Sequence, residues 1–198
     1  MNYLAHAYLS FQIPDILAGN MISDFVKGKK QFDYSKNIQI GIQLHRAIDT
    51  FTDAHAITKH AKQYLQPAVG AYSGAFIDVV YDHFLAKDTT QFATNDALQQ
   101  FATATYHTLT ILAPQLPERF VNMLPSMQLH NWLFNYQYMN GIDNSFKSVT
   151  RRAKYLASSE SCFKLFEANY VALQNCYTAF FPEVKEMAID FLNEKGIV

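Results

Sequence analysis

Apolar residues recur along most of the chain at the three- and four-residue spacing of amphipathic α-helices. No alternating strand patterns flank an Asn-Gly or Asp-Gly turn, which is the usual sequence signal of a β-hairpin. A chain of 198 residues is long enough to enclose one hydrophobic core. The pattern therefore predicts an all-α fold that forms a single helical domain over residues 1–198.

Prolines, glycines and capping residues set the bounds of the predicted helices. Ser35 and Asp53 are predicted N-caps, Pro67 is predicted to open a helix, and Gly141 to end one. Pro182 is predicted to kink or break the last helix. The prolines between residues 114 and 125 predict a loop-rich rim or lid. The predicted helices are 2–10, 14–27, 35–52, 53–65, 67–87, 95–112, 127–139 and 161–194.

Composition and charge exclude several classes of protein. Charged residues make up 17% of the chain and hydrophobic residues 49%, so it is not intrinsically disordered. The formal net charge of −1 predicts no general attraction to nucleic acid. The start of the chain lacks the pattern of a signal peptide, and no stretch reaches about 18 apolar residues, so we expect a cytoplasmic protein without a membrane span. Cys162 and Cys176 fall in one predicted helix about 21 Å apart, which excludes a disulfide between them.

Polar residues interrupt three of the predicted helices in pairs that are four residues apart. Four residues make about one helical turn, so the two members of a pair project from the same side of a helix. Helices that meet through these faces would gather imidazole and carboxylate groups, which are ligands of divalent metals. The pairs are Asn20/Asp24, His45/Asp49 and Asp78/Asp82.

The setting of the pairs favours a functional role over a structural one. The pair His45/Asp49 alone would also fit a surface hydrogen bond, but two carboxylates one turn apart, as in Asp78/Asp82, repel each other. Burying an unpaired carboxylate among apolar residues costs several kcal/mol of folding free energy. These carboxylates should therefore be paired with a cation, which Arg46 or a divalent metal could supply. We therefore predict a metal-dependent hydrolase.

Other chemistry-bearing residues give weaker signals. His6 fits a core histidine as well as a ligand or proton donor, and His83 points about 100° away from Asp82. The sequence contains no phosphate-binding glycine loop, no zinc spacing of the CxxC or HExxH kind, and no GxSxG turn. Two basic clusters fit either solvated surface or a site that attracts phosphate or an acidic macromolecule. They are Lys27, Lys29, Lys30 and Lys36, and Arg151, Arg152 and Lys154.

Four segments in series resemble the acyl carrier protein phosphodiesterases. They are MNYLAH at the start, AGNMISDFVKG from Ala18, GIQLHRAIDTFTDAH from Gly41 and DVVYDHFLAKD from Asp78. The resemblance continues through LPERF from Leu116 to the region of Trp132, so it spans most of the chain. It implies a fold akin to the HD phosphohydrolases, although Asp82 and His83 stand in the reverse of the HD order.

The resemblance also implies a reaction and a partner. The reaction is manganese-dependent hydrolysis of the phosphodiester that joins 4′-phosphopantetheine to a serine of holo acyl carrier protein. Asp24, His45 and Asp82, with Asp49 and Asp78, would hold one or two ions that polarise phosphate and activate water. Carboxylate and imidazole ligands suit Mn²⁺, and also Mg²⁺ or Fe²⁺.

The remaining candidate residues would serve the substrate. His83 or His6 would protonate the leaving serine oxygen, and Arg46 would steady the phosphate charge. Asn20 would orient phosphate or a neighbouring group. Aromatic residues would line a channel for pantetheine. An acidic carrier protein would dock on a basic cluster that contains Lys27, Lys29 and Lys30, or on Arg151 and Arg152.

Two other functions fit the same residues. The first is an HD-like phosphohydrolase that acts on a nucleotide or another small phosphodiester. The second is a non-catalytic helical module that binds carrier protein, which predicts that no metal is bound. The sequence predicts no particular oligomeric state.

Overall fold

The computed structural model describes residues 1–198 and is helical throughout, with no β-strand, which confirms the all-α prediction. Its apolar side chains form one continuous core, as expected of a single domain. The α-helices are α1 (Tyr3–Tyr8), α2 (Pro14–Ile22), α3 (Lys36–Ala54), α4 (Ala56–Val69), α5 (Ser73–Lys87), α6 (Asn95–Leu112), α7 (Glu118–Val121), α8 (Leu124–Leu129), α9 (Trp132–Asn135), α10 (Met139–Arg152), α11 (Glu160–Ala168) and α12 (Tyr170–Glu194). The 3₁₀ turns are η1 (Ser23–Phe25), η2 (Gly28–Asp33), η3 (Gly70–Tyr72) and η4 (Ala113–Gln115).

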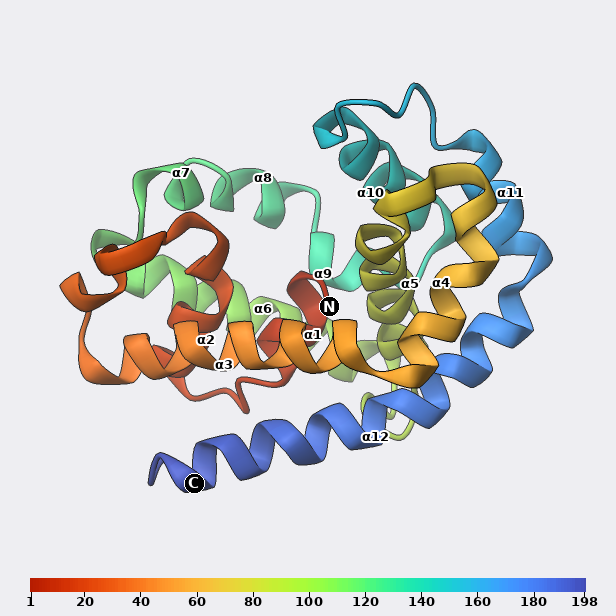
Figure 1. Cartoon of the computed structure of the whole chain (residues 1–198). Helices are drawn as coiled ribbons and strands as arrows, with labels where there is room; N and C mark the ends of the chain where they lie inside the picture. The colour runs from red at the N-terminus through yellow and green to blue at the C-terminus, as the bar shows by residue number, and fades with distance from the viewer.

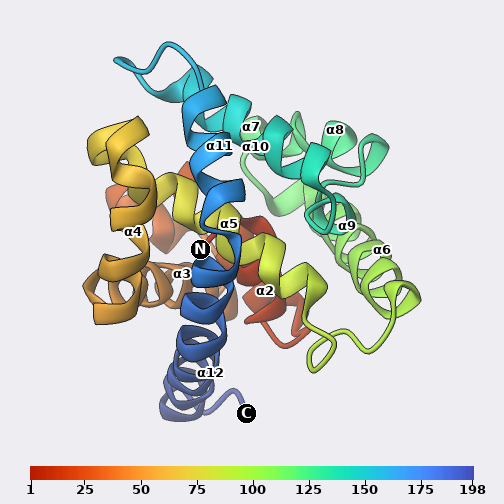
Figure 2. The same cartoon turned by 90° about the vertical axis from the view of Figure 1, so that its right-hand side faces the viewer.

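The helices form two lobes that share a base (Figure 1). One lobe contains α2, α6, α7 and α8, and the other contains α4, α5, α10 and α11. Helix α3 runs along the base, and α12 extends below it to the C-terminus (Figures 1 and 2). The short helix α1 begins at the foot of the gap between the lobes, so the start of the chain lies at the centre of the molecule.

Helices α2 and α3 cross in backbone contact at two glycines. A Cβ atom on Gly19 would lie 2.1 Å from the carbonyl oxygen of Ile38, and one on Gly41 would lie 2.3 Å from that of Ile16. Only glycine permits so close an approach. The crossing sets Asn20, next to Gly19, against His45, which follows Gly41 by one turn.

The first helix is fixed by a side chain from α5. Both carboxylate oxygens of Asp82 accept backbone N–H bonds, from Asn2 at 3.2 Å, Leu4 at 2.7 Å and Ala5 at 3.3 Å. These are the amides that a helix leaves unpaired at its N-terminus. Burial raises the pKa of Asp82 to about 7, although the amino group of Met1 and these amides act in the opposite direction. Asp82 therefore holds α1 at the centre of the fold.

Helix starts were predicted well where a side-chain oxygen caps the helix. Ser35 accepts from the N–H of Ile38, which confirms its role as an N-cap. Asp53 is not a cap: α3 continues to Ala54, and His55 accepts the N–H of Ile57 at the start of α4. The prediction that Pro67 opens a helix is wrong as well. It lies inside α4, which ends where Gly70 takes a left-handed φ of 53°.

The middle of the chain departs most from the prediction. Residues 113–129 form the short helical pieces η4, α7 and α8 instead of an open loop. The predicted helix 127–139 is broken at Asn131, whose φ of 42° is incompatible with a right-handed helix. Gly141 does not end a helix but lies in the first turn of α10, where a Cβ would meet the carbonyl oxygen of Asn135 at 2.0 Å. Helix α10 was not predicted, although its buried residues Ile142, Phe146 and Val149 have helical spacing.

The last predicted helix is two helices, separated at Asn169, and α12 continues through Pro182 without ending. The prediction that Cys162 and Cys176 share one helix is therefore wrong: they lie on α11 and α12, and both are buried and free. None of the helices combines the length and the apolarity needed to cross a bilayer.

Candidate metal centre

Two buried histidines from different helices stack on each other at the centre of the molecule. The rings of His6 on α1 and His45 on α3 are 3.9 Å apart between centroids and inclined by only 14°. Both side chains are less than a tenth exposed. The α2–α3 crossing and the anchored α1 thus bring together two histidines that are 39 residues apart in the sequence.

Asn20 binds the Nδ1 atom of both rings. Its backbone carbonyl oxygen lies 2.8 Å from Nδ1 of His45, and its side-chain Oδ1 lies 2.8 Å from Nδ1 of His6. The Asn20 amide nitrogen donates to the carbonyl oxygen of His6 and to Oγ of Ser10, so Oδ1 is the acceptor for His6. Each Nδ1 therefore donates its hydrogen to Asn20, and in the neutral ring each Nε2 carries a free lone pair.

The two Nε2 atoms converge on the carboxylate of Asp49. Nε2 of His6 lies 3.3 Å from Oδ1, and Nε2 of His45 lies 3.1 Å from Oδ2. Asp24 adds a second carboxylate, with Oδ1 at 3.4 Å from Nε2 of His45. These ligand-type atoms of His6, His45 and Asp49 lie within 4.8 Å of one another. Imidazole and carboxylate groups with outer hydrogen bonds that fix the rings are typical of a divalent metal site.

The hydrogen bonding of His45 fits a cation at this point. Its Nε2 atom is buried and has no hydrogen-bond partner, because a hydrogen on it would not point at either nearby carboxylate oxygen. Two neutral imidazoles that face a carboxylate with their lone pairs would repel it. A divalent ion between these groups would satisfy all of them, so the donor set fits a metal.

Without a metal, the charges of the centre would be balanced by a proton. Burial lowers the pKa of His45, but the carboxylates of Asp24 and Asp49 outweigh it and raise the pKa to about 9. Burial and the neighbouring His45 lower the pKa of His6 to about 4. Burial opposes ionisation of Asp49, but both histidines hold its pKa well below the usual range. Metal binding would therefore displace a proton from His45.

The third predicted pair is placed beside the centre, not in it. Asp78 on α5 accepts a bond from the amino group of Met1 at 2.8 Å, and the same amino group lies 3.7 Å from Asp49. Burial raises the pKa of Asp78, against the effect of the amino group. Asp82 is occupied by the backbone of α1. The pair Asn20/Asp24 does not share a helical face either, because α2 ends at Ile22 and Asp24 lies in η1.

His83 lies apart from the stacked histidines. Its Nδ1 donates to the carbonyl oxygen of Tyr136 at 2.7 Å, and its Nε2 lies 2.8 Å from the hydroxyl of Tyr170. Burial lowers the pKa of His83 to about 4, so the ring is neutral near pH 7. In this structure His83 links α5 to the segments around Tyr136 and Tyr170.

Arg46 points away from the centre towards the basic turn η2. It donates to the side chain of Gln31 at 2.9 Å and to the carbonyl oxygen of Val26 at 3.1 Å. Arg46 thus braces the segment between α2 and α3. The lysines of that segment are exposed on the surface: Lys27, Lys29 and Lys30.

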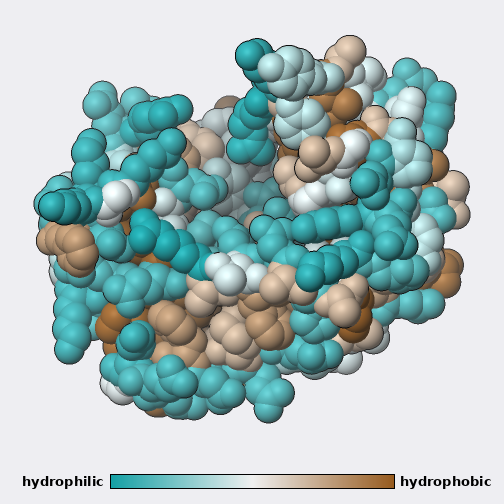
Figure 3. Space-filling view, in the orientation of Figure 1, coloured by the Kyte–Doolittle hydropathy of each residue, from teal (hydrophilic) through white to brown (hydrophobic).

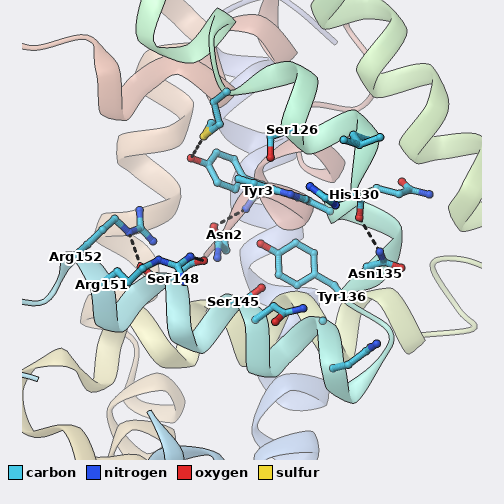
Figure 4. A pocket seen from close by; sticks show the side chains of 17 residues that line it. Asn2, Tyr3, Ser126, His130, Asn135, Tyr136, Ser145, Ser148, Arg151 and Arg152 are labelled. Carbon is cyan, nitrogen blue, oxygen red and sulfur yellow. Dashed lines mark hydrogen bonds between the residues drawn. The ribbon is translucent and has the colours of Figure 1, made fainter. Parts of the chain in front are cut away.

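A cleft of about 850 Å³ opens between the lobes beside the centre. We call it the interlobe cleft; its lining comes from residues 2–3, 123–136 and 140–152. Figure 3 shows the cleft as a hollow in the upper middle of the face that is turned to the viewer in Figure 1. In Figure 4, Tyr3 lies near its middle, Arg151 and Arg152 at one end, and His130 and Asn135 at the other.

Tyr3 connects the cleft to the histidines. It precedes His6 by three residues on α1, so both project from the same side of that helix. Its ring lies 6.1 Å from that of Trp132, and its hydroxyl contacts only the thioether of Met123, at 3.7 Å. Burial raises the pKa of Tyr3 to about 12, with Arg152 acting to lower it and Asp24 acting to raise it. Tyr3 was not among the predicted site residues, and its spacing of three residues from His6 is the one signal in the sequence that could have found it.

Comparisons with a family model and with known proteins identify the same family. A family model described as acyl carrier protein phosphodiesterase matches residues 1–184. A protein of Klebsiella pneumoniae (strain 342) named acyl carrier protein phosphodiesterase is 30% identical over 188 residues, which cover 95% of this chain and 97% of that protein. Proteins with the same name from Salmonella agona (strain SL483) and Escherichia coli O157:H7 are 29% and 28% identical, with the same coverage.

No solved structure matches the chain. The all-α class is observed directly, whereas the likeness to the HD phosphohydrolase fold stays a prediction.

Proposed function

This chain belongs to the acyl carrier protein phosphodiesterase family, and on that premise we propose that it removes 4′-phosphopantetheine from holo acyl carrier protein. The name of the family describes a phosphoric diester hydrolase, and the chain is an enzyme of that class. The proposed substrate bond is the phosphodiester between the pantetheine arm and a serine of the carrier. The products are the apo carrier and free 4′-phosphopantetheine.

The observation that carries the proposal is the convergence of His6, His45 and Asp49. These residues would hold a divalent metal, with Asp24 as a further ligand on the exposed side. Mn²⁺ suits this mixture of imidazole and carboxylate, as do Mg²⁺ and Fe²⁺. Asn20 would act as a positioning residue, because it fixes the tautomer of both histidines, and not as a substrate contact, because its side chain is fully buried.

Hydrolysis joins a water oxygen to phosphorus, breaks the bond from phosphorus to the serine oxygen, and leaves a proton on that serine. A bound divalent ion would polarise a phosphate oxygen and lower the pKa of a water molecule. The proton of that water would leave on the side of the centre that faces solvent, where the side chain of Asp49 is 41% exposed. Asp24, which is still more exposed, would stand at the entrance to the centre.

Tyr3 is the best placed hydroxyl for the phosphate. Its raised pKa keeps the phenol protonated near pH 7, and a thioether is a weak acceptor, so the O–H is free to donate to an anionic oxygen. This role replaces the one considered for His83, whose ring nitrogens have other partners. Tyr3 would bind a phosphate oxygen or the departing serine oxygen.

The carrier protein would approach over the basic turn η2. Lys27, Lys29 and Lys30 lie between the end of η1, which contains Asp24, and the first half of η2, and Arg46 braces this segment. A basic rim attracts an acidic partner and speeds its association at low salt. We therefore propose that the exposed side chains of Lys27, Lys29 and Lys30 contact the carrier, while Arg46 supports their backbone.

The proposal is tested by incubating the purified protein with holo acyl carrier protein and Mn²⁺ and measuring the intact mass of the carrier. The expected result is the loss of one 4′-phosphopantetheine group. Asp49→Asn should lower kcat/KM by about 100-fold or more, since even the outer partners of metal ligands contribute about 10- to 100-fold.

Asp53→Asn is the matched control for that variant. Asp53 lies one turn further along α3, is exposed, and pairs with Lys62 at 2.7 Å. Such a surface pair contributes little, so this variant should keep the wild-type rate. A carrier whose mass does not change, or an Asp49→Asn variant as active as Asp53→Asn, would contradict the proposed function.

A further inference from the structure

The interlobe cleft has the size and chemistry of a ligand site. Its volume of about 850 Å³ lies in the usual range for small-molecule pockets. Five asparagines and three serines are among its 17 lining residues, and only five of the 17 are hydrophobic. No aspartate or glutamate lines it, whereas Arg151 and Arg152 do. The cleft therefore suits an anionic ligand whose uncharged part is rich in hydrogen-bonding groups.

Helix α10 supplies one long wall of the cleft. Asn140, Asn144, Ser148 and Arg151 line it at spacings of four, four and three residues, so they lie along one face of the helix. At 1.5 Å per residue, the distance from Asn140 to Arg152 is about 18 Å. A ligand that uses this wall is elongated, with its negative charge at the arginine end (Figure 4).

The cleft adjoins the candidate metal centre through the start of α1. Tyr3 lines the cleft and precedes His6 of the centre by three residues on the same helix. Asn2 also lines the cleft, while the amino group of the preceding residue lies 3.7 Å from Asp49. The cleft and the metal centre are therefore neighbours through residues 1–3.

The wall opposite α10 contains a polar group without a partner. Asn131 lines the cleft and has a left-handed backbone, with φ of 42°. Its Nδ2 donates to Gln99 at 2.7 Å, but its Oδ1 is buried and has no hydrogen-bond partner. A strained backbone and an unsatisfied polar atom are features that ligand sites retain.

We propose that the interlobe cleft binds the pantetheine arm of the substrate, with the phosphate end at Tyr3 and Arg152 and the amide chain along α10. This inference rests on the proposed function and adds the place of the arm. The amides and hydroxyls of pantetheine match the asparagine and serine side chains, which both donate and accept. Tyr3 and Trp132 offer apolar surface for its methyl groups and methylenes.

The test fills the cleft with a bulky side chain. Asn144 is exposed on α10 and makes no side-chain hydrogen bond, so Asn144→Trp narrows the cleft without disturbing the core. Asn140→Trp, on the same wall, is a second variant in case the first does not fold. Asn175→Trp is the matched control, because it makes the same exchange at an exposed position of α12, which does not line the cleft.

Two measurements separate the arm from the rest of the carrier. Calorimetric titration of free 4′-phosphopantetheine into the protein with Mn²⁺ should give a Kd about tenfold higher for Asn144→Trp and unchanged for Asn175→Trp. The KM for holo carrier should rise with it. Inhibition by apo carrier, which lacks the arm, should be the same in all three proteins.

The outcomes distinguish this inference from the proposed function. If the wild type releases apo carrier but Asn144→Trp and Asn140→Trp bind 4′-phosphopantetheine normally, the arm lies elsewhere and only this inference is overturned. If inhibition by apo carrier weakens as much as binding of the free ligand, the cleft holds the carrier's own surface, which also overturns it. If the wild type leaves holo carrier intact, the proposed function fails, while the titration still decides whether the cleft binds the ligand.

Discussion

Replacing Asn20 by alanine should separate metal affinity from stability. The side chain is fully buried and makes three hydrogen bonds, to Nδ1 of His6 at 2.8 Å, to the carbonyl oxygen of His6 at 2.9 Å and to Oγ of Ser10 at 3.0 Å. Asn20→Ala leaves the Nδ1 hydrogen of His6 buried without an acceptor. An unsatisfied buried donor costs about 1–3 kcal/mol, and the lost packing adds to that, so we expect a total loss of about 2–4 kcal/mol.

The same substitution frees the ring of His6 to rotate or to change tautomer. Its Nε2 lone pair would then no longer be held towards Asp49, and we expect the Kd for Mn²⁺ to rise about 10- to 100-fold. The Nδ1 bond of His45 should survive, because it goes to the backbone oxygen of Asn20. The loss of metal affinity should therefore be partial.

Ser10→Ala is the matched control, because it removes two neighbouring hydrogen bonds but leaves both Nδ1 acceptors. The Ser10 hydroxyl donates to the carbonyl oxygen of His6 at 2.7 Å and accepts from the Asn20 amide at 3.0 Å, so its loss should cost about 1–3 kcal/mol. Urea denaturation measures stability and isothermal titration with Mn²⁺ measures affinity. If Ser10→Ala weakens Mn²⁺ binding as much as Asn20→Ala does, the outer hydrogen bond of His6 does not orient the ligand and the reasoning is wrong.

Three further predictions concern the crossing of α2 and α3, acid stability and docking. Gly41→Ala places a Cβ 2.3 Å from a backbone oxygen, so it should lower the free energy of unfolding by about 3 kcal/mol and weaken Mn²⁺ binding; unchanged stability in urea would contradict the close crossing. The folded-state pKa of His83, about 4, lies below its unfolded value of about 6.5, so the unfolded state binds more protons between these values and stability falls by about 3 kcal/mol as pH drops from 6.5 to 4. In His83→Gln, unfolding between pH 6.5 and 4 should take up about one proton fewer, so stability should fall less steeply with pH. Urea denaturation across this pH range measures the difference. Reversing the charge of Lys27, Lys29 and Lys30, at the start of η2, should raise the KM for holo carrier and flatten its dependence on salt. Unaltered kinetics would place the carrier elsewhere.

The spacing of residues along the chain predicted the class of fold and part of the candidate site. Helical periodicity is a local property, so the all-α class and the capped start of α3 could be read from the sequence. The proximity of two side chains four residues apart on one helix can also be predicted from the sequence. His45 and Asp49 are such a pair, with 3.1 Å between Nε2 and Oδ2.

Helix ends were less predictable, because backbone conformation at single residues decided them. The left-handed Asn131 ends one helical segment, whereas Pro67 and Pro182 are accommodated inside helices. Helix α10 shows a limit of another kind. Its apolar spacing was present in the sequence, but Gly141 was taken for a helix end when it is needed for contact with Asn135.

The sequence by itself determined the all-α class and the presence of metal-type side chains, because both follow from local periodicity and residue chemistry. Only the tertiary structure decided which of those side chains meet. The glycine crossing of α2 and α3 and the anchoring of α1 by Asp82 set His6 against His45 and leave His83 elsewhere. A ligand set drawn from α1, α3 and the turn η1 depends on how these segments pack, and the spacing of residues within one helix does not determine the distances between segments.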